Sequence, residues 1–135
     1  MNQEIIIYNE CSNEGKRIFL YYNENVGAME AYGYSAFLVS RVLFRPLSLF
    51  SEDLQMPCVV LAKEQVETLK SQCSVDEYFD REDYLVLHVA NPVPYDKVGY
   101  DHFVEQLREM NTEKSSEETE KKVSWFSRLV GFFDR

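Results

Sequence analysis

The chain has 135 residues, enough for one domain with a buried core and a short appendage but too few for two independent cores. An aromatic content of 14%, with nine Tyr and nine Phe, excludes a chain that is disordered throughout. The formal net charge of −9 disfavours non-specific binding to the phosphate backbone of DNA or RNA.

The first part of the chain predicts three strands and one helix. The β-rich runs 4–8 (EIIIY) and 17–22 (RIFLYY) are separated by turn-forming residues, so we expect them to form a hairpin. Run 17–22 has apolar or aromatic residues on both alternating faces and should lie inside the sheet. Residues 26–32 predict a further strand, and the apolar spacing of 36–44 predicts a helix that ends before Pro46.

The second part of the body continues the same alternation of strands and helices. The expected elements are strands at 47–50, 58–62 and 84–90, helices at 63–73 and 96–110, and an acidic loop at 74–83. Asp96 stands where it can cap the last helix. We therefore expect an α+β body over residues 1–110, with a mixed sheet of about five or six strands and three flanking helices.

The end of the chain differs in character from the body. Residues 111–122 are polar and charged and predict a flexible linker. Residues 123–135 (VSWFSRLVGFFDR) place all seven large apolar side chains on one half of a helical wheel, which predicts a tethered amphipathic helix. The side chains expected to dock are Trp125, Phe126, Leu129, Val130, Phe132 and Phe133.

An apolar stripe on a polar tether is expected to be buried against its own domain, in a partner protein's groove, or on a lipid surface. Basic residues around the stripe favour an anionic membrane. The acidic body opposes that approach, because residues 1–110 carry 9 Lys and Arg against 18 Asp and Glu. We therefore rank a protein partner, or a second copy of the chain, above a membrane surface.

The residues that carry chemistry in enzymes are not arranged here in a catalytic pattern. His88 and His102 have no His or Cys neighbour at ligand spacing, and there is no nucleophile elbow or phosphate-binding glycine pattern. The acidic loop lacks the alternating Asp/Asn spacing and the glycine of a calcium loop. We expect no enzyme activity, no cofactor, no metal site and no small-molecule substrate.

The cysteines and the N-terminal residues bear on localisation. Cys11, Cys58 and Cys73 are odd in number and have no Cys-x-x-Cys spacing, which is typical of a reducing compartment. The first residues do not form a secretory signal, and no apolar stretch is long enough to span a bilayer. These features predict a cytoplasmic protein, with peripheral membrane association open through the C-terminal stripe.

Residues 17–36 (RIFLYYNENVGAMEAYGYSA) resemble the opening of the N-terminal mismatch-recognition domain of MutS-type DNA repair proteins. In that family an apolar strand runs into a G-D-F-Y-E segment, a short aromatic and glycine stretch, and a helix. Here these parts are 18–22, 26–30, 31–33 and 35–43. The order and spacing of 55–58, 63–73 and 84–89 are also similar, so the resemblance covers about residues 17–90.

The resemblance implies the family's fold and places a possible nucleic-acid surface at Glu30, Tyr32 and Tyr34. In the family the Phe of the segment wedges into the base stack and the Glu hydrogen-bonds a mispaired base. This chain has the Glu at Glu30 but Ala28 at the wedge position, and residues 4–8 are strand-like where the family has a helix. The resemblance therefore implies a scaffold whose DNA chemistry is lost or changed.

Two functions from different classes follow from the sequence. The first is a non-catalytic interaction module that docks a partner through its C-terminal helix. The alternative is a nucleic-acid-binding accessory related to the mismatch-recognition domain but lacking the aromatic wedge. The alternative requires a contiguous basic face built from Arg17, Arg41, Arg45 and Lys63.

Overall fold

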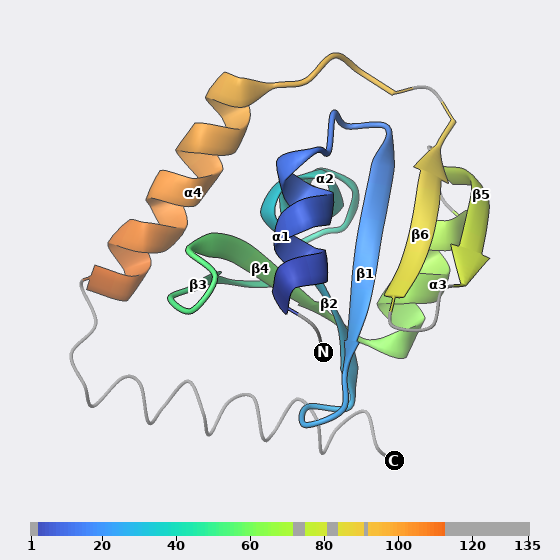
Figure 1. Cartoon of the computed structure of the whole chain (residues 1–135), viewed down its shortest axis with the longest axis horizontal. Helices are drawn as coiled ribbons and strands as arrows, with labels where there is room; N and C mark the ends of the chain where they lie inside the picture. Colours follow the sequence, from blue (N-terminus) through green and yellow to red (C-terminus); the bar gives the residue numbers. More distant parts are fainter. Residues whose placement is uncertain (1–2, 72–74, 81–83, 91, 113–135) are drawn as a thin grey trace.

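The computed structural model describes residues 3–71, 75–80, 84–90 and 92–112 (Figure 1). These residues form four helices and six strands, so the predicted α+β fold class is confirmed. In chain order the elements are α1 (Gln3–Cys11), β1 (Arg17–Asn23), β2 (Ala28–Tyr32), α2 (Gly33–Val42), β3 (Leu47–Ser51), β4 (Met56–Leu61), α3 (Lys63–Ser71), β5 (Val75–Asp80), β6 (Tyr84–Val89) and α4 (Lys97–Thr112).

The six strands form one sheet in the order β3-β4-β2-β1-β6-β5, and every neighbouring pair is antiparallel. β1 and β2 lie in the middle of the sheet, as the apolar residues on both faces of run 17–22 predicted. β3 and β5 lie at the two edges of the sheet.

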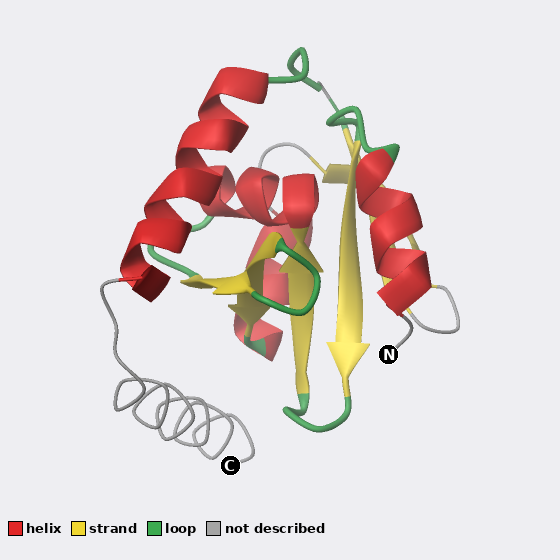
Figure 2. Ribbon diagram, turned by 60° about the vertical axis from the view of Figure 1, so that its left-hand side comes forward, coloured by secondary structure: helices red, strands yellow, loops and turns green. Residues whose placement is uncertain are grey.

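Alternate residues of β1 point to the two faces of the sheet and build two cores. Ile18 and Leu20 belong to the core under α2, α3 and α4, whereas Phe19 and Tyr21 belong to the core under α1. Figure 2 separates these layers, with α1 on one side of the sheet and the other helices on the opposite side. Burial of apolar side chains on both faces accounts for the order of the layers.

The prediction of a strand at residues 4–8 is wrong, because this segment lies within helix α1. Three consecutive β-branched Ile residues favour a strand locally. In the folded protein, however, the inward face of α1 carries Ile6 with Asn9 and Glu10, which follow it by three and four positions, and all three are buried. Ile7 and Tyr8 are exposed, so the helix has almost no apolar stripe for a sequence pattern to detect.

The predicted hairpin between 4–8 and 17–22 is wrong for the same reason. The hairpin partner of β1 is β2, with Asn23 paired to Ala28. The N–H groups of Val26 and Gly27 donate to the carbonyl of Asn23, and Gly27 has a φ of +71° that favours glycine. The turn residues Asn23 and Gly27 were therefore the stronger hairpin signal.

The predicted acidic loop at 74–83 is also partly wrong, because residues 75–80 form the edge strand β5, which pairs with β6. Acidic residues suit an edge strand, since charge opposes pairing with another chain. The other predicted strands and helices of the body are found within a few residues of their expected bounds.

The end of α4 sets the limit of what the structure describes. The helix runs to Thr112, two residues into the predicted linker. The remainder of the linker and the predicted amphipathic helix at 123–135 lie outside the described residues. Within the described ranges, no helix has the length and apolar character needed to cross a membrane.

Candidate functional site

The three residues predicted to form a nucleic-acid surface are buried. The exposed fractions of Glu30, Tyr32 and Tyr34 are 5%, 6% and 2%. Glu30 and Tyr32 contact each other in the core under α1, whereas Tyr34 belongs to the core on the opposite face of the sheet. The structure therefore brings two of the three residues together and places the third across the sheet.

Glu30 is held by structural hydrogen bonds. Its Oε1 accepts from the Tyr32 hydroxyl at 2.9 Å and from Nδ2 of Asn23 at 3.1 Å. Burial raises the pKa of the Glu30 carboxyl. Cys58, the cross-strand partner of Tyr32, is buried, and burial followed by the nearby Glu30 raises the pKa of its thiol. The thiol therefore stays protonated, which is the unreactive form.

As an exposed surface, the predicted set Glu30, Tyr32 and Tyr34 is wrong. Ala28, at the position of the family's wedge, is itself buried, with an exposed fraction of 8%. The sequence shows Glu30 as a lone carboxylate on a strand of small, apolar and aromatic residues, but it does not show that a helix covers each face. The residue pattern of one strand cannot show whether a helix packs over its second face, because that helix comes from elsewhere in the chain.

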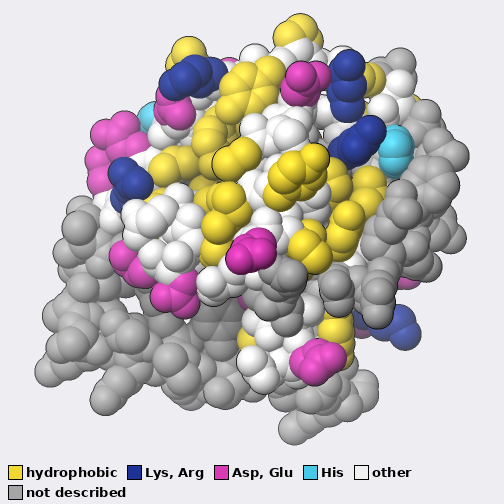
Figure 3. Space-filling model, viewed as in Figure 1, with side chains coloured by type: hydrophobic (Ala, Val, Ile, Leu, Met, Phe, Trp, Pro, Cys, Tyr) yellow, Lys and Arg dark blue, Asp and Glu magenta, His cyan; other side chains and the backbone are white. Residues whose placement is uncertain are grey.

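The basic residues proposed for a nucleic-acid face are distributed over the body. Arg17, Arg41 and Arg45 line three different hollows, and Lys63 begins α3. Arg45 lies over the ring of Phe44, with its guanidinium carbon 5.2 Å from the ring centroid. On the face that carries α1, hydrophobic side chains occupy the centre, and Lys and Arg alternate with Asp and Glu around them (Figure 3). Across the described residues, these four cations do not gather in one hollow.

The most extensive buried polar cluster was not found by sequence reasoning and centres on Glu10. Its Oε1 accepts from the backbone N–H of Ser35 at 3.0 Å and from Nδ2 of Asn13 at 3.2 Å. Its Oε2 accepts from the hydroxyls of Tyr21 and Ser35, both at 2.9 Å. Ser35 Oγ in turn accepts from the Phe19 N–H at 3.0 Å. One carboxyl therefore ties α1, β1 and α2 together.

This cluster gives α2 the cap that its own sequence lacks. The N-cap residue Tyr32 makes no side-chain hydrogen bond to the helix, so the first N–H groups of α2 need another acceptor. Glu10, 25 residues earlier in the chain, accepts from one of them. Burial raises the pKa of the Glu10 carboxyl to about 7, although its four donors oppose the shift. The available sequence signal was that Ile6 and Glu10 lie four positions apart, which places them on one face if the segment is helical, and the expected strand at 4–8 concealed it.

Gly33 allows this cluster to close. Its φ is +56°, and a Cβ at this position would lie 2.9 Å from Cβ of Glu10. We expect Gly33→Ala to lower the free energy of unfolding by about 2 kcal/mol or more, because left-handed strain adds to a clash with atoms close to the α1 backbone. Urea denaturation measures the change.

Gly27→Ala is the matched control for this prediction. Gly27 also has a positive φ, but nothing lies within 4 Å of the point that an alanine methyl group would occupy, so only the backbone strain of about 1 kcal/mol applies. Equal losses in the two variants would show that the approach of Glu10 to Gly33 contributes nothing.

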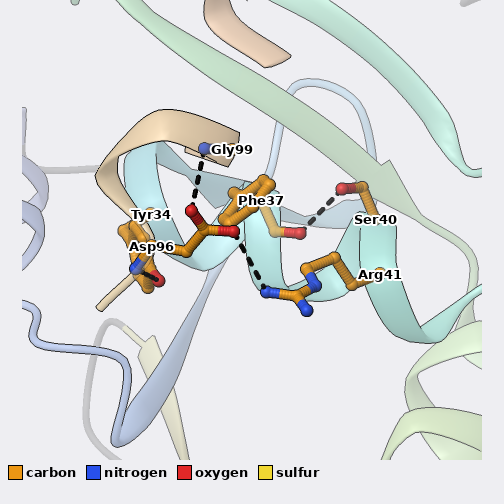
Figure 4. A network of polar contacts seen from close by, with 6 residues as sticks. All are labelled: Tyr34, Phe37, Ser40, Arg41, Asp96 and Gly99. Carbon is orange, nitrogen blue, oxygen red and sulfur yellow. Dashed lines mark hydrogen bonds and ion pairs between the residues drawn. The ribbon is translucent and has the colours of Figure 1, made fainter. Parts of the chain in front are cut away.

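A second polar network joins α2 to α4 (Figure 4). The Tyr34 hydroxyl accepts from the backbone N–H of Asp96 at 2.8 Å, and the Tyr95 ring stacks on the Tyr34 ring at 4.5 Å. Oδ1 of Asp96 accepts from the N–H of Gly99 at 2.9 Å, so the predicted cap of this helix is confirmed. Oδ2 of Asp96 lies 3.8 Å from the Arg41 guanidinium. Tyr34 thus positions α4 and is not a ligand-facing residue.

An open hollow lies where the C-terminal end of α4 meets the start of β3, and we call it the α4–β3 groove. Its volume is about 650 Å³. The apolar side chains that line it are Pro46, Leu47, Val60, Ala62, Leu107 and Met110, and its polar members include Arg45 and Glu64. Volume and lining are those of a site for apolar side chains.

The predicted docking residues Trp125, Phe126, Leu129, Val130, Phe132 and Phe133 lie outside the described residues. In the part of the chain that the structure describes, no three His, Cys, Asp or Glu side chains gather as metal ligands. Cys11 is exposed and Cys58 is buried, and both are free thiols. Comparison with known proteins finds no matching family model, no matching curated protein and no matching solved structure.

Proposed function

We propose that this protein is a non-catalytic interaction module whose α+β body carries a docking segment at residues 123–135. The observation that carries the proposal is the position of the end of α4. This helix lies at the outside of the body and ends there at Thr112, so the polar linker starts at the periphery of the molecule (Figure 1). The apolar stripe that follows is therefore tethered where a partner can reach it.

The internal arrangement of the body supports a scaffold role. Among the described residues, the carboxyls of Glu10 and Glu30 are buried, and both accept hydrogen bonds from neighbouring side chains. Both faces of the sheet have helices and a core of their own among the described residues. The body thus has the elements of a folded unit without the terminal stripe.

A protein partner has better support than a lipid surface. Burial of seven large apolar side chains contributes on the order of 10–15 kcal/mol, whereas ordering thirteen residues costs about 20 kcal/mol. A preformed protein groove reduces that cost, and it avoids the repulsion between the acidic body and an anionic membrane. A reducing cytoplasm is the compartment proposed for this interaction.

The resemblance to the MutS mismatch-recognition domain remains a prediction about the shape of the body. The family has a helix before its first strand, where a strand was expected in this chain. Because residues 3–11 form helix α1, this difference from the family disappears. A nucleic-acid-binding role has weaker support, since Glu30, Tyr32 and Tyr34 are buried and the net charge is −9.

Deletion of residues 123–135 tests the proposal. We expect the truncated protein to keep its cooperative unfolding transition, with a melting temperature within a few degrees of the full chain, because the two cores are built from residues of the body. Thermal unfolding followed by circular dichroism measures this. Leu69→Ala is the positive control, because Leu69 is fully buried and its truncation should cost about 3 kcal/mol.

A fall of many degrees on deletion would instead identify the segment as part of the core and would contradict the proposal. Flotation with anionic liposomes separates the two kinds of partner. If Trp125→Glu combined with Phe133→Glu abolishes flotation of the full chain, the partner is a membrane and not a protein.

A further inference from the structure

The α4–β3 groove is an open hollow of about 650 Å³ among the described elements of the body. Four elements meet in it, with Leu107 and Met110 contributed by the last turns of α4. Met110 is 48% exposed. Phe44, the ring beneath the Arg45 guanidinium at the groove, is 86% exposed. Apolar side chains left this open in water mark a surface that gains from being covered.

The position of the groove favours a cover from the same chain. The chain leaves α4 at Thr112, two residues after Met110, which lines the groove. Residues 113–122 separate this point from the apolar stripe and contain no apolar side chain to hold them elsewhere. Ten such residues have a root-mean-square span of about 17 Å and a maximum reach of about 35 Å. The stripe therefore lies within reach of the groove on its own molecule.

The size and chemistry of the α4–β3 groove are also compatible with the apolar stripe of residues 123–135. A thirteen-residue helix is about 20 Å long and presents its apolar side chains along one face. A groove of about 650 Å³ takes part of such a face rather than all seven side chains, so docking is partial and reversible. The flexible thioether of Met110 adapts to aromatic rings, and Arg45 and Glu64 offer both charges to the polar side of the helix.

We propose that the apolar stripe of residues 123–135 docks reversibly in the α4–β3 groove of the same molecule, as an intramolecular latch. The latch rests on the proposed function, because a partner would compete for the same side chains. A second copy of the chain is disfavoured as the occupant of the groove at ordinary protein concentrations. A short flexible linker holds its own segment at an effective concentration in the millimolar range, far above that of a micromolar protein.

Trp125 is the only tryptophan of the chain, so its fluorescence reports the latch directly in the full-length protein. We expect its emission to lie at shorter wavelength than in the guanidinium-unfolded chain, with reduced quenching by acrylamide. Met110→Glu, which changes the groove, should abolish both the shift in emission and the protection from quenching. Phe133→Glu, which changes the docking segment, should abolish them as well. Met110 is half exposed, so the body is expected to tolerate the substitution, and far-UV circular dichroism checks this.

Val98→Glu is the matched control. Val98 is an exposed apolar residue of the same helix, 82% exposed, and lies about three turns away from Met110. It should leave the emission and quenching of Trp125 unchanged. An effect equal to that of Met110→Glu would attribute the change to added charge and would overturn the latch.

Three further results would overturn the latch. If Trp125 of the folded chain emits at the same wavelength as in the unfolded chain, the segment is not docked. That result leaves the proposed function intact. Shielding of Trp125 that persists in Met110→Glu would place the ring at another surface. Shielding that disappears on dilution would assign the groove to a second copy. The proposed function fails separately, through a large loss of melting temperature on deletion.

Discussion

Glu10→Ala is expected to lower the free energy of unfolding by about 4 kcal/mol at pH 5, the largest effect of any single substitution proposed for this protein. The change removes the acceptor for the Ser35 N–H and for the Tyr21 hydroxyl, both of which are buried. An unsatisfied buried polar group costs about 1–3 kcal/mol, and loss of a helix cap costs about 1 kcal/mol. Urea denaturation at fixed pH measures the loss.

Glu10→Gln is the control that keeps the shape and the carbonyl oxygen. The amide oxygen can accept from the Ser35 N–H, and the Tyr21 hydroxyl can rotate to accept from the amide nitrogen. We therefore expect Gln to cost about 1 kcal/mol or less at pH 5. Equal losses of stability in Glu10→Ala and Glu10→Gln would mean that an amide of the same shape cannot replace the carboxyl, and would contradict the expectation that the amide takes over its hydrogen bonds.

The free energy of unfolding is expected to fall by about 3 kcal/mol as the pH rises from about 4.5 to about 7. Burial raises the pKa of Glu10 from 4.5 to about 7, so in this window the folded state keeps a proton that the unfolded state has lost. Stability therefore decreases with rising pH wherever the folded state binds more protons, at about 1.4 kcal/mol per unit of pKa shift. Denaturation curves at half-unit steps between about pH 4 and pH 8 measure the slope.

The same two variants test the origin of this slope. In Glu10→Gln the slope should largely disappear, and the part that remains has the sign expected for Glu30, whose pKa is also raised by burial. The stability gap between the wild type and Glu10→Ala should narrow by about 3 kcal/mol from pH 5 to pH 8. A wild-type stability that rises across this window would show that the carboxyl is ionised in the folded state at all these pH values.

The elements whose pattern is local were predictable from the sequence. Run 17–22 has apolar residues on both faces, and it forms the central strand β1. The apolar spacing of residues 97–110 and the position of Asp96 predicted α4 and its cap, because both signals lie within a few residues of the structure they produce. The first helix was not predictable in this way, since its inward face is largely polar.

The buried carboxyls show why site prediction failed where fold prediction succeeded. Glu30 sits on a strand whose pattern suggests a solvent-facing carboxylate, yet α1 and the neighbouring strands cover it. Glu10 follows the expected strand 4–8, among residues expected to form a turn, yet it accepts from the backbone N–H of Ser35 in α2, 25 residues away. Whether a polar residue is exposed depends on which element packs over it, and that element is distant in the chain.

The sequence by itself was sufficient to predict the α+β class and most element bounds. It also shows the contrast between an acidic body and an apolar terminal stripe. Composition, periodicity and turn chemistry carry this information because they depend on neighbours within about ten residues. Long-range packing alone decided the helical state of residues 3–11 and the burial of Glu10, Glu30 and Tyr34. The α4–β3 groove belongs to the second group, since it exists only where α4 meets the consecutive elements β3, β4 and α3 from an earlier part of the chain.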